Sequence, residues 1–158
     1  MGTMKLTQIG KIVCDEEGFS IQLAPAYAKA LTGLTGFSHI EALWWFDGCD
    51  DSASRARLTE AKPYVHGPDT LGVFATRSPC RPNPIALSCV GVTYLDAENG
   101  VIGLDYIDAN DESPVLDIKP YTPSLDRAEQ ASVPEWCAHW PTCREASGDF
   151  DWDSEFNF

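Results

Sequence analysis

Two arginines in a proline-rich loop are the residues of this chain best suited to bind an anion. Arg77 and Arg81 lie in Gly72–Ser88, GVFATRSPCRPNPIALS, where three prolines restrict the backbone. A stiff loop loses little conformational entropy on binding, and each guanidinium offers a planar fork of donors to a carboxylate or phosphate. The stretch therefore predicts an anion-binding site. The alternative is a rigid strand connection whose arginines pair with the chain's own carboxylates.

Cysteines offer a second kind of chemistry. The six of them are predicted to be free thiols, because no export signal accompanies them. Cys80 stands between the two arginines, whose positive charge would favour its thiolate. Cys137, His139 and Cys143 gather three potential metal ligands, but their spacing is not that of a zinc knuckle, so no metal site is assigned. A thiol or metal sensor at these positions is a third hypothesis for the function.

The net charge limits the partners of the chain. There are 11 Lys and Arg residues against 24 Asp and Glu residues, a net charge of −13 at pH 7. Non-specific binding to nucleic acid depends on neutralising phosphates, so DNA is not an expected partner. If RNA binds, the basic side chains near the loop should form one local patch. These residues are Arg55, Arg57, Lys62, Arg77 and Arg81.

Length and composition predict one folded domain. The chain has 158 residues, 44% of them hydrophobic, which is enough to bury a core. No apolar run reaches the roughly twenty residues of a membrane helix, and no signal peptide is recognisable, so a cytoplasmic protein without membrane contact is expected. Residues 1–145 are interpreted as a single β-barrel domain and residues 146–158 as an acidic C-terminal tail.

Short β-rich segments separated by turn residues make up most of the chain. Two hairpins are predicted, one from Leu6–Val13 and Phe19–Leu23, the other from Ile85–Leu95 and Val101–Ile107. Ile40–Phe46 is predicted to be a buried strand. In Val115–Tyr121 the period of two places Val115, Asp117 and Lys119 on one face and buries Leu116 and Ile118 on the other, with Pro120 ending the strand.

Helical signals are few. Pro25–Leu34 has apolar residues at helical spacing and proline near its start, and Val133–Arg144 is a second candidate helix. Asp47–Lys62 is predicted to be a long loop with one helical turn around Ser54–Leu58. The fold class is therefore mainly β (α+β), a small closed or nearly closed antiparallel β-barrel with one or two short helices.

Two long motifs resemble the paired signature of the TsaA-like family, also called YaeB-like. They are GVFATRSPCRPNPIALS and PVLDIKPYTP, and the similarity extends to GFSHIEALWWF at 36–46 and PEW at 134–136. The resemblance implies a β-barrel enzyme that uses S-adenosylmethionine to methylate N6 of threonylcarbamoyladenosine beside the anticodon of tRNA. It also implies a homodimer that contributes to the cofactor site.

The resemblance also implies which residues form the site. The matching cofactor contacts are Phe46, Asp47, Arg77, Leu87, Asp111, Glu112, Ser113 and Pro114, and the candidates for the acceptor side are Asn83, Asp117, Lys119 and Tyr121. A guanidinium suits the cofactor's carboxylate, an apolar slot its adenine, and carboxylates or aromatic faces its sulfonium. Methyl transfer is an in-line displacement, so alignment and exclusion of water are the enzyme's main tasks. A plain ion pair is the alternative role for Asp117 and Lys119.

Some positions depart from the family's pattern. Members carry a Pro-Arg-Gln segment after the first strand, where this chain has only CDEEG. Cys80, Ala86, Asp47 and the stretch 111–114 also differ from the residues that are usual in the family. The second hypothesis is therefore a non-catalytic module that binds S-adenosylmethionine or a nucleotide and has lost or changed its acceptor.

Overall fold

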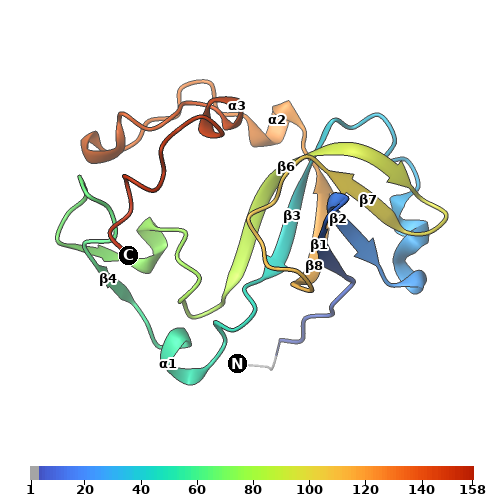
Figure 1. Cartoon of the computed structure of the whole chain (residues 1–158), viewed down its shortest axis with the longest axis horizontal. Coiled ribbons are helices and arrows are strands. Elements are labelled where there is room, and N and C mark those ends of the chain that lie inside the picture. The colour runs from blue at the N-terminus through green and yellow to red at the C-terminus, as the bar shows by residue number, and fades with distance from the viewer. Residues whose placement is uncertain (1–3) are drawn as a thin grey trace.

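Six antiparallel strands close into a barrel, in the order β1-β2-β7-β6-β3-β8 (Figure 1). The computed structural model describes residues 4–158. The strands are β1 (Gly10–Asp15), β2 (Gly18–Leu23), β3 (His39–Trp45), β6 (Ile85–Asp96), β7 (Val101–Leu104) and β8 (Pro114–Pro120). The predicted closed antiparallel β-barrel is confirmed.

Both predicted hairpins form, with shifted bounds. β1 pairs with β2 around a turn at Glu16 and Glu17, and β6 pairs with β7. β1 begins at Gly10 rather than Leu6, because its neighbours β2 and β8 pair with it only from Gly10 onward. β7 ends at Leu104, and Asp105, the next residue, bonds Gly91 of β6 through both its backbone N–H and its side chain.

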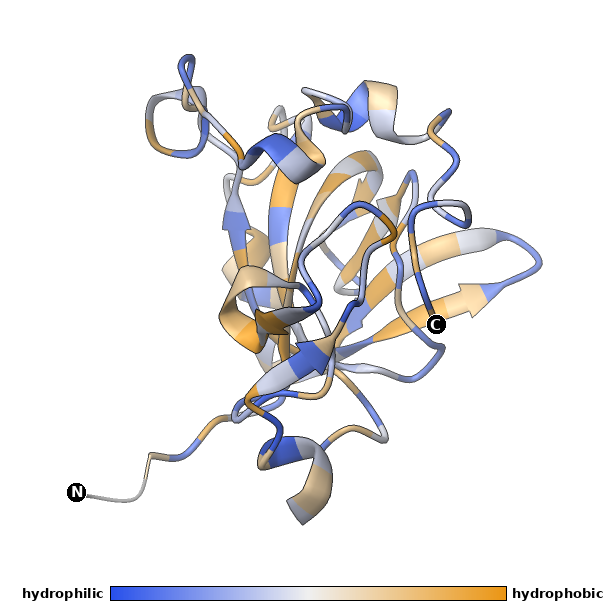
Figure 2. Ribbon diagram, turned by 90° about the vertical axis from the view of Figure 1, so that its left-hand side faces the viewer, coloured by the Kyte–Doolittle hydropathy of each residue, from blue (hydrophilic) through white to orange (hydrophobic). Residues whose placement is uncertain are grey.

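Apolar side chains from every strand fill the barrel. Ile12, Ile21, Ile40, Ile102 and Val115 are fully buried and belong to one core cluster. In Figure 2 the strands are largely hydrophobic, whereas the turns that connect them are largely hydrophilic. Fully burying such a side chain stabilises the fold by about 1.5–3 kcal/mol relative to an exposed one.

Two strands differ from the prediction in which residues they bury. β3, predicted as a buried strand, buries only one face, with Ile40, Ala42 and Trp44 inward. In β8 the register against β3 shifts, because Leu43 pairs with Asp117 but Trp44 pairs with Val115. The extra residue is Leu116, which forms a β-bulge and reverses the alternation. Val115 and Ile118 therefore both pack on the core, and the predicted shared face of Val115 and Asp117 was wrong.

The helices are shorter than predicted. Pro25–Leu34 forms a 3₁₀ helix, η1 (Pro25–Leu31), which ends before Gly33 at φ 86°. A helix over Val133–Arg144 was wrong, because Pro141 lacks a donor and disfavours helical backbone at Trp140. Only short helical turns form there, η3 (Glu135–Cys137) and the start of α3 (Arg144–Ser147). The other short helices are α1 (Ser52–Arg55), η2 (Val73–Ala75) and α2 (Pro123–Asp126). In residues 4–158 no helix is long and apolar enough to cross a membrane.

A second, smaller core lies beside the barrel. The predicted loop 47–62 contains a strand, β4 (Thr59–Ala61), which pairs with β5 (Thr70–Gly72). The C-terminal segment reaches this hairpin, as Figure 1 shows, and Tyr64 bridges to Phe156. Tyr64 also stacks on Trp136 at 5.3 Å and meets Trp140 at 5.0 Å. Residues 146–158 therefore pack against the rest of the chain.

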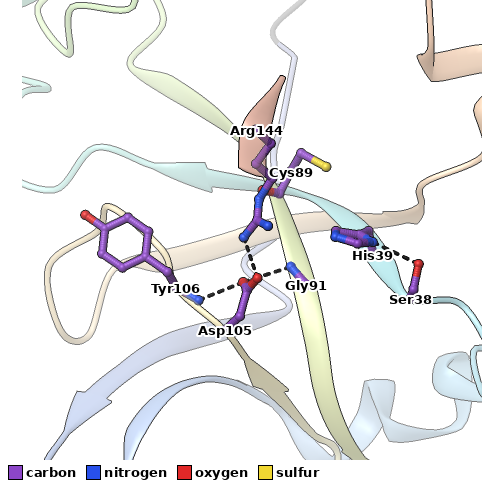
Figure 3. A network of polar contacts seen from close by, with 7 residues as sticks. All are labelled: Ser38, His39, Cys89, Gly91, Asp105, Tyr106 and Arg144. Atoms are coloured by element: carbon purple, nitrogen blue, oxygen red, sulfur yellow. Dashed lines mark hydrogen bonds and ion pairs between the residues drawn. The ribbon is translucent and has the colours of Figure 1, made fainter. Parts of the chain in front are cut away.

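Arg144 fastens the C-terminal segment to the barrel (Figure 3). Its Nε donates to the carbonyl of Cys89 on β6 at 2.9 Å, and its Nη2 donates to Oδ2 of Asp105 at 2.6 Å. Asp105 Oδ1 accepts from the backbone N–H groups of Gly91 and Tyr106. One carboxylate thus joins α3, β6 and the chain that follows β7.

Candidate functional site

The two arginines of the proline-rich loop have different roles. Arg81 points into the loop, where its Nη2 donates to the carbonyls of Val73 and Thr76 and so holds η2 in place. Arg77 is exposed, and its Nη1 donates to the carbonyl of Leu87 at 2.9 Å. A guanidinium has five N–H donors, so Arg77 keeps the capacity to bind a carboxylate. Of the two arginines expected to bind an anion, only Arg77 is therefore placed to do so, and Arg81 has a structural role.

The outer face of β6, β3 and β8 gathers further candidates. Leu43 pairs with Leu87 on one side and with Asp117 on the other, so three outward side chains form a row. Glu41 likewise pairs with Cys89 and Lys119 in the next row. Sequence reasoning missed Glu41, Leu43 and Cys89. The period of two in HIEALWW could have found Glu41 and Leu43, since it opposes them to the inward Ile40, Ala42 and Trp44, whereas Cys89 joins them only through the pairing of β6 with β3.

Charge on this face is partly desolvated. Burial and then the charge of Asp126 raise the pKa of Glu41, while Cys89 and Arg77 act in the opposite direction. Burial and then Glu41 raise the pKa of the Cys89 thiol to about 11. Cys89 is therefore a neutral thiol at pH 7 and a poor nucleophile.

Asp117 and Lys119 form an ion pair along β8. Their side chains are 48% and 62% exposed, so the pair adds little to stability. Both groups are open to solvent and can reach a ligand on this face.

The end of β3 carries a second group of candidates. The backbone N–H of Phe46 donates to the carbonyl of Pro84 at 2.9 Å, which places the exposed Asp47 beside the start of β6. The Arg55 guanidinium lies over the ring of Trp45 at 5.8 Å, and its Nη2 donates to Oδ1 of Asn83 at 3.4 Å. Arg55 reaches Asn83 from α1, whose first turn is capped by the carboxylate of Asp51.

Residues 111–114 lie along β1 before they enter β8. Asp111 Oδ1 accepts from the backbone N–H of Cys14 at 2.9 Å, and Glu112 pairs with Lys11. Glu112 has φ 66°, a left-handed conformation that favours glycine, the residue usual here in the family that the motifs resemble. Ser113 is 1% exposed, and its Oγ has no hydrogen-bond partner among residues 4–158. A buried hydroxyl without a partner costs free energy, so it is suited to a ligand.

The register shows which candidates lie close together. Val115 pairs with Trp44, so Pro114 and Phe46 lie at the same end of β3. Asp117 pairs with Leu43, about 10 Å from Phe46 along the strand at about 3.3 Å per residue. The backbone N–H of Tyr121 donates to the carbonyl of His39 at the other end of β3, about 23 Å from Phe46. Among the candidates on β8 and just beyond it, Tyr121 thus lies farthest from Phe46.

The prediction of free cysteines is confirmed. All six thiols are free, and Cys80 lies beside Cys49, whose pKa is raised by burial and by Cys80. Cys137 Sγ donates to the carbonyl of Pro134 at 3.4 Å. Across the described part of the chain, the one group of three potential ligands is His66, His139 and Glu155.

The predicted patch of bases is smaller than expected. Arg57 pairs with Glu60 at 3.3 Å, and Arg81 binds backbone carbonyls inside its loop. Arg55, Lys62 and Arg77 are exposed and keep their charge available to a phosphate. Of the five predicted basic residues, these three are exposed and have no carboxylate partner in the described part of the chain.

Residues 8–127 match the family of tRNA-methyltransferase O N-terminal domains. The chain belongs to this family. The matched range contains all the cofactor and acceptor candidates and ends before η3. The resemblance that the central motifs indicate is therefore confirmed.

Relatives place the chain more closely within this family. An S-adenosyl-L-methionine-binding protein of Archaeoglobus fulgidus is 41% identical over 110 residues, which cover 70% of this chain and 73% of that protein. A tRNA (adenine(37)-N6)-methyltransferase of Escherichia coli is 37% identical over 67% of this chain and 45% of its own length. The crystal structure of TrmO from Pseudomonas aeruginosa matches with a TM-score of 0.63 and 29% identity, covering 83% of this chain and 62% of that one. The chain thus spans less than half of the Escherichia coli enzyme.

Proposed function

We propose that this chain is an S-adenosylmethionine-dependent methyltransferase that acts on N6 of threonylcarbamoyladenosine in tRNA. One observation carries the proposal. Segments far apart in the sequence, which contain the motifs of the family, meet on β6, β3 and β8 around Arg77. Relatives with the same motifs are named as S-adenosyl-L-methionine-binding proteins and as tRNA methyltransferases.

The residues present suit the cofactor. Arg77 would bind its carboxylate, and Phe46 and Leu87 supply apolar surface for its adenine. The buried Ser113 Oγ needs a hydrogen-bond partner, which a hydroxyl or amino group of the cofactor would supply. The remaining proposed contacts are Asp47, Asp111, Glu112 and Pro114. When bound, the cofactor supplies an electrophilic methyl group on its sulfonium.

The acceptor side of the proposed site follows β8. Asp117, beside Lys119, would orient the acceptor nitrogen for in-line attack, and Asn83, held by Arg55 at the Phe46 end of β3, would contact another part of the acceptor. The proton on that nitrogen needs to leave only after the methyl group has transferred, and the exposed Asp117 or solvent can accept it. Tyr121 lies too far along β8 to touch the same small group, so we assign it to a more distant part of the tRNA.

We also propose that the active form is a cytoplasmic homodimer. Two apolar side chains near the site are exposed, Phe74 at 84% and Leu58 at 64%. Leu58 lies beside η2, because its carbonyl accepts from the backbone N–H of Val73 at 3.0 Å. A second copy that covered them would bury apolar surface and could add residues to the cofactor site. Light scattering should give a molar mass twice that of the chain, and Phe74→Asp should reduce this to the mass of a single chain.

A non-catalytic module that binds S-adenosylmethionine is the second candidate function. The turn between β1 and β2 consists of Glu16 and Glu17, so this chain has no Pro-Arg-Gln segment there to contact the cofactor. Binding without turnover would be the outcome if that segment is essential for alignment.

The test combines two measurements. Calorimetric titration of the cofactor-free chain with S-adenosylmethionine should show binding, and Arg77→Ala should weaken it by about tenfold or more, the loss of one charge-assisted hydrogen bond. Arg57→Ala, which removes an exposed arginine paired with Glu60, is the matched control and should bind normally. Transfer of a labelled methyl group to tRNA from cells that lack the modification then separates the enzyme from the module. Absence of cofactor binding would contradict both functions.

A further inference from the structure

Three distant parts of the chain bring two histidines and a glutamate together. His66 lies between β4 and β5, His139 follows η3, and Glu155 lies near the C-terminus. One ligand atom from each lies within 4.8 Å of the other two. Only His66 belongs to the range that the family matches, so the group is a feature of this chain beyond the family's barrel.

The geometry of the group is close to that of a metal site. His139 Nε2 and Glu155 Oε2 are 2.8 Å apart, and the rings of His66 and His139 meet edge to face with centroids 5.1 Å apart. Ligand atoms of a tetrahedral zinc ion lie about 3.3 Å from one another, given bonds of about 2.0–2.1 Å. Both imidazoles are exposed, so small side-chain movements would close the group around an ion.

Glu155 is the least accessible member and the best anchor. It is 3% exposed, and its Oε1 has no hydrogen bond of ordinary geometry in the described part of the chain, although the indole N–H of Trp140, likewise unpaired, is a nearby donor. Its backbone is fixed, because its carbonyl accepts from the backbone N–H of Val65 at 2.9 Å. A buried carboxylate with an unpaired oxygen is costly unless a cation or donor binds it.

We propose that His66, His139 and Glu155 bind a divalent transition-metal ion of the zinc class. Two imidazoles and one carboxylate suit zinc, and three protein ligands leave one position for water. The ion would replace the direct contact between His139 and Glu155 and join the C-terminal segment to the β4–β5 hairpin. The acidic residues of the same segment, Asp149, Asp151 and Asp153, add attraction for a cation. A plain ion pair between His139 and Glu155 is the alternative.

Calorimetric titration of the chelator-treated full chain with Zn²⁺ tests the proposal, with Co²⁺ as a spectroscopic probe. We expect one Zn²⁺ per chain and an increase in Tm that a chelator reverses. His66→Gln should weaken Zn²⁺ binding by about 10-fold to 100-fold or more, since loss of an outer partner alone has that effect. Because His66 is exposed, the metal-free variant should keep its Tm. His39→Gln, which removes the histidine on β3, is the matched control and should bind normally.

Several results would overturn the proposal. One is no binding of Zn²⁺ or Co²⁺ at stoichiometric concentrations, and another is equal binding by His66→Gln. A thiolate-to-cobalt charge-transfer band that Cys143→Ser removes would place the ion on cysteines instead. Glu155→Gln provides a second check, because it should abolish binding while keeping a hydrogen-bonding side chain beside His139.

Discussion

Asp105 shows how one side chain can join three elements of this fold. Its carboxylate accepts from Arg144 of α3, from the backbone of Gly91 on β6 and from its neighbour Tyr106. Burial alone would raise the pKa of Asp105, but these hydrogen bonds outweigh it and hold the pKa below its ordinary value. A folded-state pKa below the unfolded one means that the ionised group stabilises the fold.

Replacement of Asp105 should make stability less dependent on pH in acid. The stabilisation is fully present above the unfolded pKa of about 3.9 and is lost as pH falls through the lower folded pKa. Asp105→Asn should therefore lower the free energy of unfolding at neutral pH by about 1 kcal/mol, allowing for solvent screening of a partly exposed group. Urea unfolding across acid pH measures this. Asp108→Asn, an exposed carboxylate nearby, should change little, and a difference that stays constant into acid would contradict the assignment.

Asp117 and Tyr121 should affect different steps of the proposed reaction. Asp117 lies opposite Leu43, about 10 Å from Phe46 along β3, whereas Tyr121 lies opposite His39, about 23 Å from Phe46. Asp117→Asn should lower kcat by about tenfold or more, equal to about 1.4 kcal/mol of transition-state stabilisation. Tyr121→Ala should raise the KM for tRNA and leave S-adenosylmethionine binding unchanged. Steady-state methylation assays give both values, and a lower affinity of Tyr121→Ala for the cofactor would refute the separation.

At the level of elements, the close approach of β1 and β2 depends on Gly10. A Cβ at this position would lie 2.5 Å from the carbonyl oxygen of Gln22 and 2.9 Å from Cα of Leu23. Both atoms belong to the backbone of β2, which cannot move without breaking the ladder of hydrogen bonds that closes the barrel. The position therefore requires glycine for space, with no help from an unusual φ.

Gly10→Ala should consequently destabilise the whole barrel. Overpacking of this kind costs about 1–3 kcal/mol, and a clash with backbone belongs at the upper end of that range. Gly148→Ala is the control, because its Cβ would meet nothing within 4 Å, and the change should be neutral or stabilising by up to about 1 kcal/mol. Equilibrium unfolding in urea compares the two. Equal stabilities would show that β1 and β2 can separate at no cost.

The elements that sequence predicts well are those with a clear period and a local turn. The β1–β2 and β6–β7 hairpins follow from apolar alternation around turn residues, and closure of the barrel follows from the number of such strands. The bulge at Leu116 could not be predicted, because it depends on how β8 pairs with β3 and not on its own residues. The role of Arg81 was missed for a similar reason, since Val73 and Thr76 reach it only through the fold of the loop.

At the scale of the molecule, the chain has two cores of different character. The barrel is filled by aliphatic residues, whereas the second core stacks aromatic side chains from β4–β5 and the C-terminal segment. The second core could not be predicted from sequence, because its aromatic residues follow no period and are spread along the chain between positions 64 and 156. Trp152 is central to it, with ring centroids 5.4 Å from Trp140 and 4.7 Å from Phe150.

Trp152→Ala should weaken the second core and leave the barrel folded. Loss of a large, partly buried aromatic side chain should cost about 2–3 kcal/mol, below the range for a fully buried one. Phe158→Ala is the control, because Phe158 is 94% exposed and should matter by less than about 0.5 kcal/mol. Hydrogen exchange should show faster opening of β4, β5 and the C-terminal segment, with protection of β1, β2 and β3 kept. A uniform loss of protection would show that the two cores unfold as one unit.

The charge of the whole molecule limits how the proposed tRNA substrate could bind. With a net charge of −13, long-range attraction to phosphates is absent, and affinity has to come from a local surface and from contacts with the modified base. The candidates for that surface are the exposed Arg55, Lys62 and Arg77, since Arg57 is paired with Glu60 and the part-buried Arg81 is bound to two carbonyls of its own loop. The binding should therefore release few counterions.

A salt titration of tRNA binding tests this count. For a single-stranded loop the slope of log K against log salt is about −0.7 per phosphate contact, so three contacts predict a slope of about −2. Arg55→Ala should reduce the slope by about 0.7, whereas Arg57→Ala, already paired with Glu60, should leave it unchanged. A slope about twice as steep would mean that a second copy of the chain brings its own three basic residues to the same tRNA, or that the acidic surface is neutralised by cations on binding. Measurement of the slope at a fixed Mg²⁺ concentration separates the two, because only the second depends on the cation supplied.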